Sequence, residues 1–166
     1  IDTYYTFLDT TQTLEDKNIL SVEYLHEGDT LHLGDSQLKV YSEYTPEIIE
    51  RNLDLPNSSS LILKISGKKQ SMLFFADFED AELADKLYEK YGHELDATYI
   101  QLGHRGNNAL APSYYLNLHP SAVYADAPYF LYTGEQSKCK NTLAYLKDHD
   151  VACYTFHGAP HRVYVR

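Results

Sequence analysis

"QSMLFFADFEDAELADKLYEKYG", residues 70–92, places an apolar run directly before an amphipathic one. The first run is rich in aromatic and β-forming residues, which predicts a strand that ends at Asp77. In the second run apolar residues recur at helical spacing, the start is acidic and Gly92 follows, which predicts a helix with a glycine cap. The stretch therefore predicts one strand–helix unit of a sheet covered by helices.

The rest of the second half repeats this alternation, and the first half differs from it. Strands are expected at residues 96–103, 121–127, 151–157 and 161–165, and helices at residues 111–119 and 133–150. Earlier, residues 58–66 pair with the strand before Asp77 as a hairpin, and Gly-Asp turns at Gly28 and Gly34 flank a strand at residues 30–33. Together these patterns predict an α/β (α+β) fold with a mixed β-sheet and helices on one face.

The segments before the hairpin give weaker patterns. Residues 3–17 have apolar side chains at helical spacing and predict a short amphipathic helix, and residues 18–25 predict a strand. Residues 45–57 contain two prolines and no clean period, which predicts a loop with one helical turn. No stretch is long enough to be a linker, so residues 1–166 are expected to form a single domain.

Composition limits the partners. The chain has 24 acidic and 14 basic residues and a formal charge of -10, so its field repels phosphate backbones and strong non-specific nucleic-acid binding is not expected. No apolar run approaches the ~20 residues of a membrane span. The two cysteines, Cys139 and Cys153, lack CxxC spacing and are interpreted as ordinary buried thiols, with a single disulfide as the alternative.

Two polar residues follow predicted strands and are the first candidates for chemistry. Asp77 follows "MLFFA" and His104 follows "TYIQLG". Ligands bind beyond the carboxyl ends of strands in sheets of this kind, and His and Asp are common ligands of zinc, manganese and iron. The two residues make only half of a metal site, because a working centre needs three or more protein ligands. A loop-stabilising hydrogen bond from His104 is the alternative.

The other histidines give no complete motif. His93 follows a glycine helix cap and His119 ends a predicted helix, where a polar or positive side chain is locally favourable. For His157 and His161, in "FHGAPH", a role in shaping a site and a loop-stabilising hydrogen bond both remain open. The sequence contains no GxSxG, P-loop or GxGxxG stretch, so serine-hydrolase and nucleotide-cradle functions have no support.

The ordered motifs resemble those of a known family. They are "EGDTLHLGDSQLKVY", "NSSSLILKISGKKQSMLFFADFE", "ATYIQLGHRGNN" and "LKDHDVACYTFHGAPHRVYV". In this order they resemble the C-terminal half of a metallo-β-lactamase-fold hydrolase, and most closely the catalytic domain of bacterial DNA-uptake (competence) proteins and its stand-alone relatives. The match covers nearly the whole chain, and each motif alone is short.

The resemblance implies roles for particular residues. Asp77 stands where the family has its metal-bridging carboxylate, and His104 where it has a late metal-binding histidine. Asn57 and Ser60 correspond to an Asn-x-x-Ser motif near the metal face, and Gly106 would shape the loop under His104.

The sequence also departs from the family. Arg105 replaces a second histidine, and a guanidinium cannot ligate a cation and repels it. Ala76 replaces the usual glycine before the bridging aspartate. The family's early His-x-His-x-Asp-His motif, which supplies most of the metal ligands, is absent from these residues.

Taken together, the resemblance implies a metal-dependent parent hydrolase that uses metal-bound hydroxide on a phosphodiester or another ester. The complete parent would hold zinc or manganese. This chain would have no catalytic residue of its own and would be inactive alone, and whether it holds a metal by itself stays open. Its uncovered apolar sheet face would need the N-terminal half of the domain or a second copy as a partner. Two locations stay open, the bacterial cytoplasm and the bacterial cell surface.

Two alternatives remain. The chain could be a metal-free interaction or ligand-binding module on the same fold, with Arg105 and tyrosines contacting the ligand. It could also be an unrelated mixed α/β domain in which Asp77 and His104 are structural.

Overall fold

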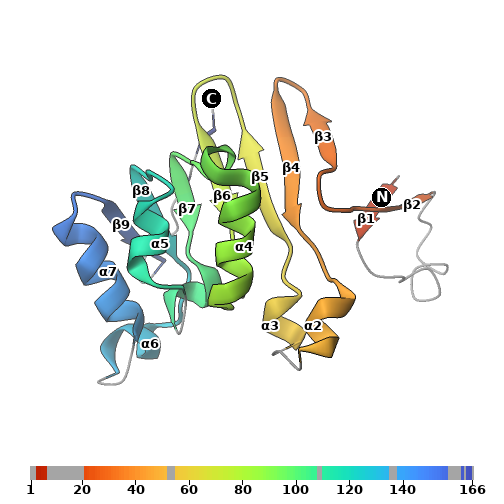
Figure 1. Cartoon of the computed structure of the whole chain (residues 1–166). Coiled ribbons are helices and arrows are strands. Elements are labelled where there is room, and N and C mark those ends of the chain that lie inside the picture. Colours follow the sequence, from red (N-terminus) through yellow and green to blue (C-terminus); the bar gives the residue numbers. More distant parts are fainter. Residues whose placement is uncertain are drawn as a thin grey trace.

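Seven strands form one mixed sheet in the order β3-β4-β5-β6-β7-β8-β9 (Figure 1). The computed structural model describes residues 3–6, 21–51, 55–107, 110–134, 138–156, 162, 164 and 165. The strands are β3 (Thr30–Leu33), β4 (Ser36–Ser42), β5 (Ile62–Ser66), β6 (Ser71–Phe74), β7 (Tyr99–Gln101), β8 (Ala122–Ala125) and β9 (Ala152–Thr155). The mixed sheet predicted from the sequence is therefore confirmed.

The first half of this sheet is an antiparallel meander, as predicted. Strands β3, β4, β5 and β6 pair antiparallel in sequence order. The turn between β3 and β4 contains Gly34 at a φ of 62°, a conformation that costs glycine little. Strand β6 ends at Phe74 rather than at Asp77, because the side chain of Gln101 accepts the backbone N–H groups of Phe75 and Ala76 and ends the pairing there.

The second half is parallel, and its crossovers place the helices on one face. Strands β6, β7, β8 and β9 pair parallel, and α4 (Ala81–Tyr91), α5 (Pro112–Leu116) and α7 (Lys138–Asp148) connect them. Because such crossovers are right-handed and run in one direction along the sheet, all of these helices cover the same face, as Figure 1 shows. The remaining helices are α2 (Pro46–Glu50), α3 (Leu55–Ser58), η2 (Gly92–Leu95), η3 (Gly103–Gly106) and α6 (Tyr129–Thr133).

Helix α4 begins and ends where its sequence predicts. The side chain of Asp80 accepts the backbone N–H of Leu83 at 2.8 Å and caps the amino end. Gly92 has a φ of 50° at the carboxyl end, and its N–H bonds the carbonyl of Tyr88. Ala84 and Leu87 face the core, so the local signals and the packing of this helix agree.

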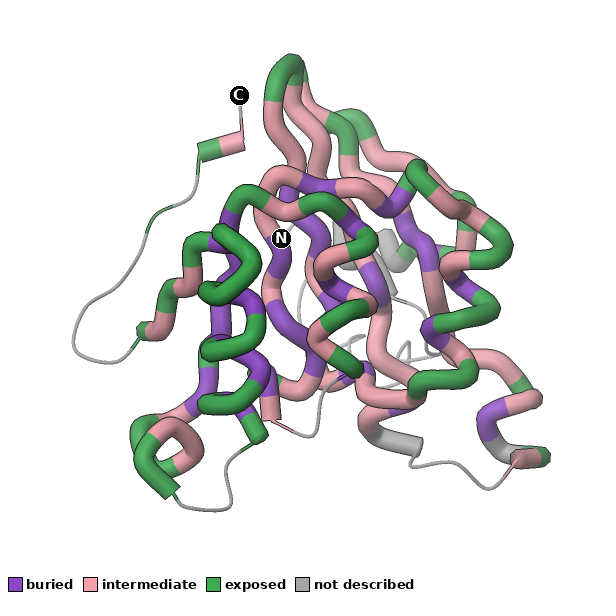
Figure 2. Tube along the Cα trace, turned by 60° about the vertical axis from the view of Figure 1, so that its left-hand side comes forward, coloured by how far each residue is buried: buried purple, intermediate pink, exposed green. Residues whose placement is uncertain are grey.

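The main core lies between the sheet and the crossover helices. Phe75, Leu102 and Tyr115 are completely buried there, and the rings of Phe75 and Tyr115 meet edge to face at 5.7 Å. Figure 2 shows buried residues concentrated along the central strands. Both cysteines are free, as predicted, and burial raises the pKa of the Cys139 thiol to about 11.

Three predicted segments differ from the structure. Residues Thr3–Thr6 form a strand, β1, that pairs parallel with β2 (Ser21–Tyr24), so the helix predicted from residue 3 is wrong at its start and otherwise falls on residues that are not described. Parallel pairing with a distant segment outweighs the local helical period there. The loop at residues 45–57 contains two helical turns, α2 and α3. Of the strand predicted at residues 161–165, the described residues belong to no strand.

The opposite face of the sheet carries a second row of apolar side chains. Register places Leu63, Phe74 and Tyr124 on that face, with the polar Gln101 between Phe74 and Tyr124. Met72 and Tyr124 form a smaller cluster there, against which Phe74 packs. The three crossover helices lie on the other side of the sheet (Figure 1). Within the described residues, no helix combines the length and the apolar character of a membrane span.

Candidate functional site at the carboxyl edge of the sheet

Strands β6, β7 and β8 run parallel, so the loops that follow them meet at one edge of the sheet. Asp77 lies in the loop after β6, His104 and Arg105 in the loop after β7, and Asp126 directly after β8. The sequence analysis did not identify Asp126, because it fell inside the strand predicted at residues 121–127, whereas β8 ends at Ala125. The topology therefore collects these side chains at the carboxyl edge.

The backbone at this edge is held in an unfavourable conformation. Ala76, His104 and Arg105 have φ values of 49°, 44° and 59°, where a side chain costs about 1 to 2 kcal/mol per residue. The His104 N–H donates to the carbonyl of Ala76 at 2.9 Å, which ties the two loops together. Non-glycine residues with positive φ cluster at functional sites more often than elsewhere.

Close packing at Gly103 and a hydrogen bond to Tyr115 hold this turn against the core. A Cβ on Gly103 would lie 2.3 Å from the carbonyl oxygen of Phe78, so no larger residue fits. The hydroxyl of Tyr115 accepts the N–H of Gly103 at 3.0 Å. Burial raises the pKa of Tyr115 far above its usual value, so its hydroxyl keeps its proton.

Gln101 joins three loops through its side-chain amide. Its oxygen accepts the N–H groups of Phe75 and Ala76 at 3.0 and 2.8 Å, and its nitrogen donates to Asp126 Oδ1 at 3.2 Å. The sequence analysis missed this residue. A signal was present, since Gln101 is a polar residue inside an otherwise apolar strand sequence.

A chain of hydrogen bonds connects Asn57 to His104 through Glu79. The Asn57 side-chain nitrogen donates to Glu79 Oε1 at 3.0 Å, and Glu79 Oε2 lies 2.6 Å from His104 Nδ1. With the proton on Nδ1, the other ring nitrogen of His104 carries the lone pair. Ligating histidines in proteins are oriented in this way by a carboxylate. Glu79 was not predicted from the sequence.

Asp77 pairs with Arg105 instead. Arg105 Nε lies 3.5 Å from Asp77 Oδ1, and their side chains are 49% and 43% exposed. Such an exposed and long ion pair contributes little to stability, about 0 to 1 kcal/mol. Asp77 and His104 thus lie at the same edge, and each has a charged partner of its own.

The other predicted site residues lie around this centre. The Ser60 N–H donates to the Asn57 carbonyl at 3.1 Å and closes the turn that follows α3. Gly106 has a φ of 80°, and a Cβ there would lie 3.1 Å from Cys139 Sγ. His157 lies outside the described residues.

A cavity of about 630 Å³ opens beside these groups. Its polar lining includes Asp77, Gln101, Arg105 and Asp126. The remainder of the lining comes mainly from the apolar face of the sheet: Leu61, Leu63, Met72, Phe74, Ala76, Tyr124 and Phe156. An apolar pocket with a few convergent polar groups at its mouth is typical of a site for small organic ligands.

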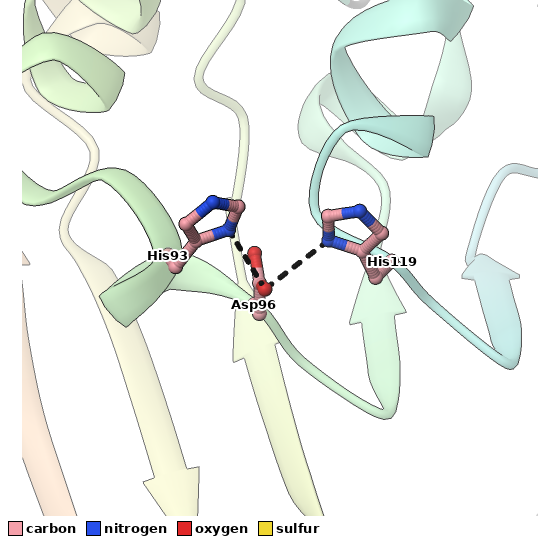
Figure 3. A group of neighbouring side chains, drawn as sticks. All are labelled: His93, Asp96 and His119. Carbon is pink, nitrogen blue, oxygen red and sulfur yellow. Dashed lines mark hydrogen bonds and ion pairs between the residues drawn. The ribbon is translucent and has the colours of Figure 1, made fainter.

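The carboxyl edge carries two side chains of types that ligate metals, His104 and Asp77, and a complete centre needs at least three protein ligands. The opposite edge of the sheet carries a different group, His93, Asp96 and His119 (Figure 3). In the described part of the chain, these three side chains have donor atoms close enough to share one ion. The sequence analysis interpreted His93 and His119 only as helix-end residues. The spacing of His93 and Asp96 in "GHELD" was the available signal.

Comparison with known proteins identifies the fold. No protein-family model and no curated protein sequence matches the chain. Among solved structures, CmlA, a diiron beta-hydroxylase from Streptomyces venezuelae, is similar with a TM-score of 0.62 and 14% identity, over 89% of this chain and 35% of that chain. The metallo-beta-lactamase fold protein YhfI from Bacillus subtilis is similar with a TM-score of 0.56 and 9% identity, over 92% of this chain and 61% of that chain.

These matches span about a third to three fifths of the neighbours' own length. At such low identity the likeness concerns architecture, and it agrees with the mixed seven-stranded sheet and one-sided helices of this chain. The chain accordingly has a metallo-β-lactamase-like fold.

Proposed function

We propose that this chain supplies part of the active site of a metal-dependent hydrolase of the metallo-β-lactamase superfamily that acts on a phosphodiester or another ester. The Asn57–Glu79–His104 chain of hydrogen bonds is the observation that carries the proposal. It orients an imidazole at the edge where the fold places its ligands and leaves one ring nitrogen available. A divalent ion, zinc or manganese, would supply Lewis-acid chemistry at such a centre.

In this proposal His104 and Asp77 are two of the ligands, and further ligands come from outside the described residues. The neighbouring Gln101 holds the loops after β6, β7 and β8 in register. The apolar wall of the 630 Å³ cavity would take the organic part of the substrate. His157 remains a predicted site-shaping residue.

The apolar face suggests where the rest of the site comes from. Leu63, Met72 and Phe74 line the cavity on the face that the crossover helices leave uncovered, and both structural neighbours have chains well beyond the matched part. We propose that the N-terminal half of a metallo-β-lactamase-like domain packs on this face and brings the missing ligands. A second copy of this chain is the alternative occupant.

Metal content and activity of the natural polypeptide that contains this chain test the proposal. We expect a bound divalent metal and hydrolysis of bis(4-nitrophenyl) phosphate or 4-nitrophenyl acetate. His104→Ala should remove most of the activity, and Glu79→Gln should weaken metal affinity about 10- to 100-fold. His149→Ala is the control, because the His149 side chain bonds the carbonyl of Tyr145 and stacks on the Tyr145 ring, just after α7 and away from the carboxyl-edge residues. A polypeptide without metal and without hydrolysis contradicts the proposal.

The ion pair of Asp77 with Arg105 favours a second candidate function, a metal-free ligand-binding module. Arg105 at the cavity mouth is a suitable partner for an anionic group of a ligand. This function predicts that Arg105→Ala weakens ligand binding while the metal-free protein binds as well as the metal-loaded one. Fragment screening by NMR, with and without a chelator, separates the two candidates.

A further inference from the structure

We propose that His93, Asp96 and His119 form a binding site for a single Zn²⁺ ion at the edge opposite the candidate active site. Asp96 Oδ2 lies 3.2 Å from His93 Nδ1 and 3.1 Å from His119 Nδ1. Figure 3 shows both rings turned toward this one carboxylate. The donor atoms of the group all lie within 4.8 Å of one another.

These distances match those within a zinc centre. With Zn–N and Zn–O bonds of about 2.0 to 2.2 Å, tetrahedral geometry separates neighbouring donors by about 3.4 Å. The two observed nitrogen–oxygen distances are within a few tenths of an ångström of this value. A Zn²⁺ ion can replace the two bridging protons, which move to the outer ring nitrogens, with little movement of the side chains.

The unequal environment of the Asp96 carboxylate is a second and independent observation. Oδ2 accepts a hydrogen bond from each of the two imidazoles, whereas Oδ1 is buried and has no hydrogen-bond partner among the described residues. A buried carboxylate oxygen without a partner is rare in proteins, and a bound ion is one of the recognised explanations. A cation bound by the carboxylate compensates its charge without a donor at Oδ1.

The fold holds the three residues in place. Asp96 caps the carboxyl end of η2, with its N–H bonded to the carbonyl of His93. His119 has a φ of 52°, and its N–H bonds the carbonyl of Leu116 at the end of α5. The neighbouring Ala97 N–H donates to the Leu118 carbonyl at 3.1 Å and joins the two turns. The ligands are therefore arranged before an ion binds.

The donor set selects the metal. Two imidazoles and one carboxylate suit zinc better than calcium or magnesium, which prefer oxygen ligands alone. The histidine side chains are 77% and 62% exposed, so an ion can enter from solvent and water can take the fourth position. Bound zinc would join the turn after α4 to the turn after α5.

Isothermal titration of the metal-free chain with Zn²⁺ tests the site, together with NMR of the imidazole nitrogens. We expect binding of one ion, with changed nitrogen signals of His93 and His119. His93→Ala, His119→Ala and Asp96→Asn should each weaken the binding at least about tenfold. Zinc should also raise the thermal midpoint of the wild type, and the shift should disappear in His119→Ala.

Two sets of controls make the outcome decisive. His26→Ala is matched, because His26 Nδ1 lies 3.1 Å from Glu43 Oε2 as a single exposed histidine–carboxylate pair, and it should leave the affinity unchanged. His104→Ala and the double variant His157→Ala/His161→Ala remove the other candidate histidines and should also leave it unchanged. Binding that survives His93→Ala and His119→Ala overturns this site and leaves the hydrolase proposal untouched. Binding that is lost in His104→Ala also overturns this site, and it assigns the ion to the carboxyl edge, as the hydrolase proposal expects.

Discussion

The backbone N–H of His104 donates to the carbonyl of Ala76 at 2.9 Å, and both residues have positive φ. This bond crosses from the loop after β7 to the loop after β6. It sets where Asp77 and Arg105, the next residues along each loop, leave the sheet. The position of the candidate site thus depends on two strained residues that support each other.

Ala76→Gly should stabilise the protein. Glycine adopts a φ of 49° without the steric cost of a Cβ, and that gain exceeds its larger entropy in the unfolded chain. We expect the free energy of unfolding in urea to rise by about 0.5 to 1 kcal/mol. Ala152→Gly, at an exposed position inside strand β9, is the matched control and should lower it. A loss in both variants would show that the strain at Ala76 is negligible.

Gly103→Ala should be strongly destabilising. The new methyl group would lie 2.3 Å from the Phe78 carbonyl oxygen, a rigid backbone atom. We expect a loss of about 3 kcal/mol, measured as the urea midpoint at constant m-value. Gly34→Ala has a φ of 62° and open space around the added atom, so it should cost only about 1 kcal/mol. Equal losses in the two variants would contradict the steric explanation.

Arg105→Ala should raise the affinity of the carboxyl edge for divalent cations. The substitution removes the positive charge 3.5 Å from Asp77, worth about 1 kcal/mol at a solvent-exposed site or about fivefold in affinity. Mn²⁺ relaxation enhancement measures the change. Lys68→Ala is the control, because it breaks the exposed ion pair between Lys68 on the β5–β6 turn and Asp35 on the β3–β4 turn and alters net charge equally. A gain in both variants would indicate a general charge effect.

Tyr41 should make stability fall at alkaline pH. Burial, and then the charge of Glu94, raises the pKa of Tyr41 from 10.0 to about 12. The folded protein therefore holds a proton that the unfolded chain releases, so this stabilisation is complete below pH 10 and is lost between pH 10 and about 12.

Tyr41→Phe isolates this contribution. At neutral pH it should cost about 1 kcal/mol, because the hydroxyl donates to the Glu94 carbonyl at 3.2 Å. The difference between the wild type and the variant should shrink as the pH rises from 10 to 12, in urea titrations at each pH. A difference that stays constant would show that Tyr41 does not titrate in this window.

Local patterns explain which elements were predictable. In residues 70–92 the strand propensity, the helical period, the Asp80 cap and Gly92 all act between near neighbours, and the structure agrees with them. The helix predicted at residues 3–17 is wrong at Thr3–Thr6, because pairing with β2 is a contact that no local period reveals. The end of β6 at Phe74 likewise depends on the side chain of Gln101, 26 residues from Phe75.

The sequence by itself determined the alternation of strands and helices from β6 to β9, the one-sided covering of a mixed sheet, and the edge at which Asp77 and His104 lie, because periodicity, caps and crossover handedness are local or general rules. Only the tertiary structure decided the partners of those side chains. Glu79 at His104, Arg105 at Asp77, and the meeting of His93 and Asp96 with His119 depend on distances between separate turns. Such distances follow from packing of the whole core, which no short stretch of sequence contains.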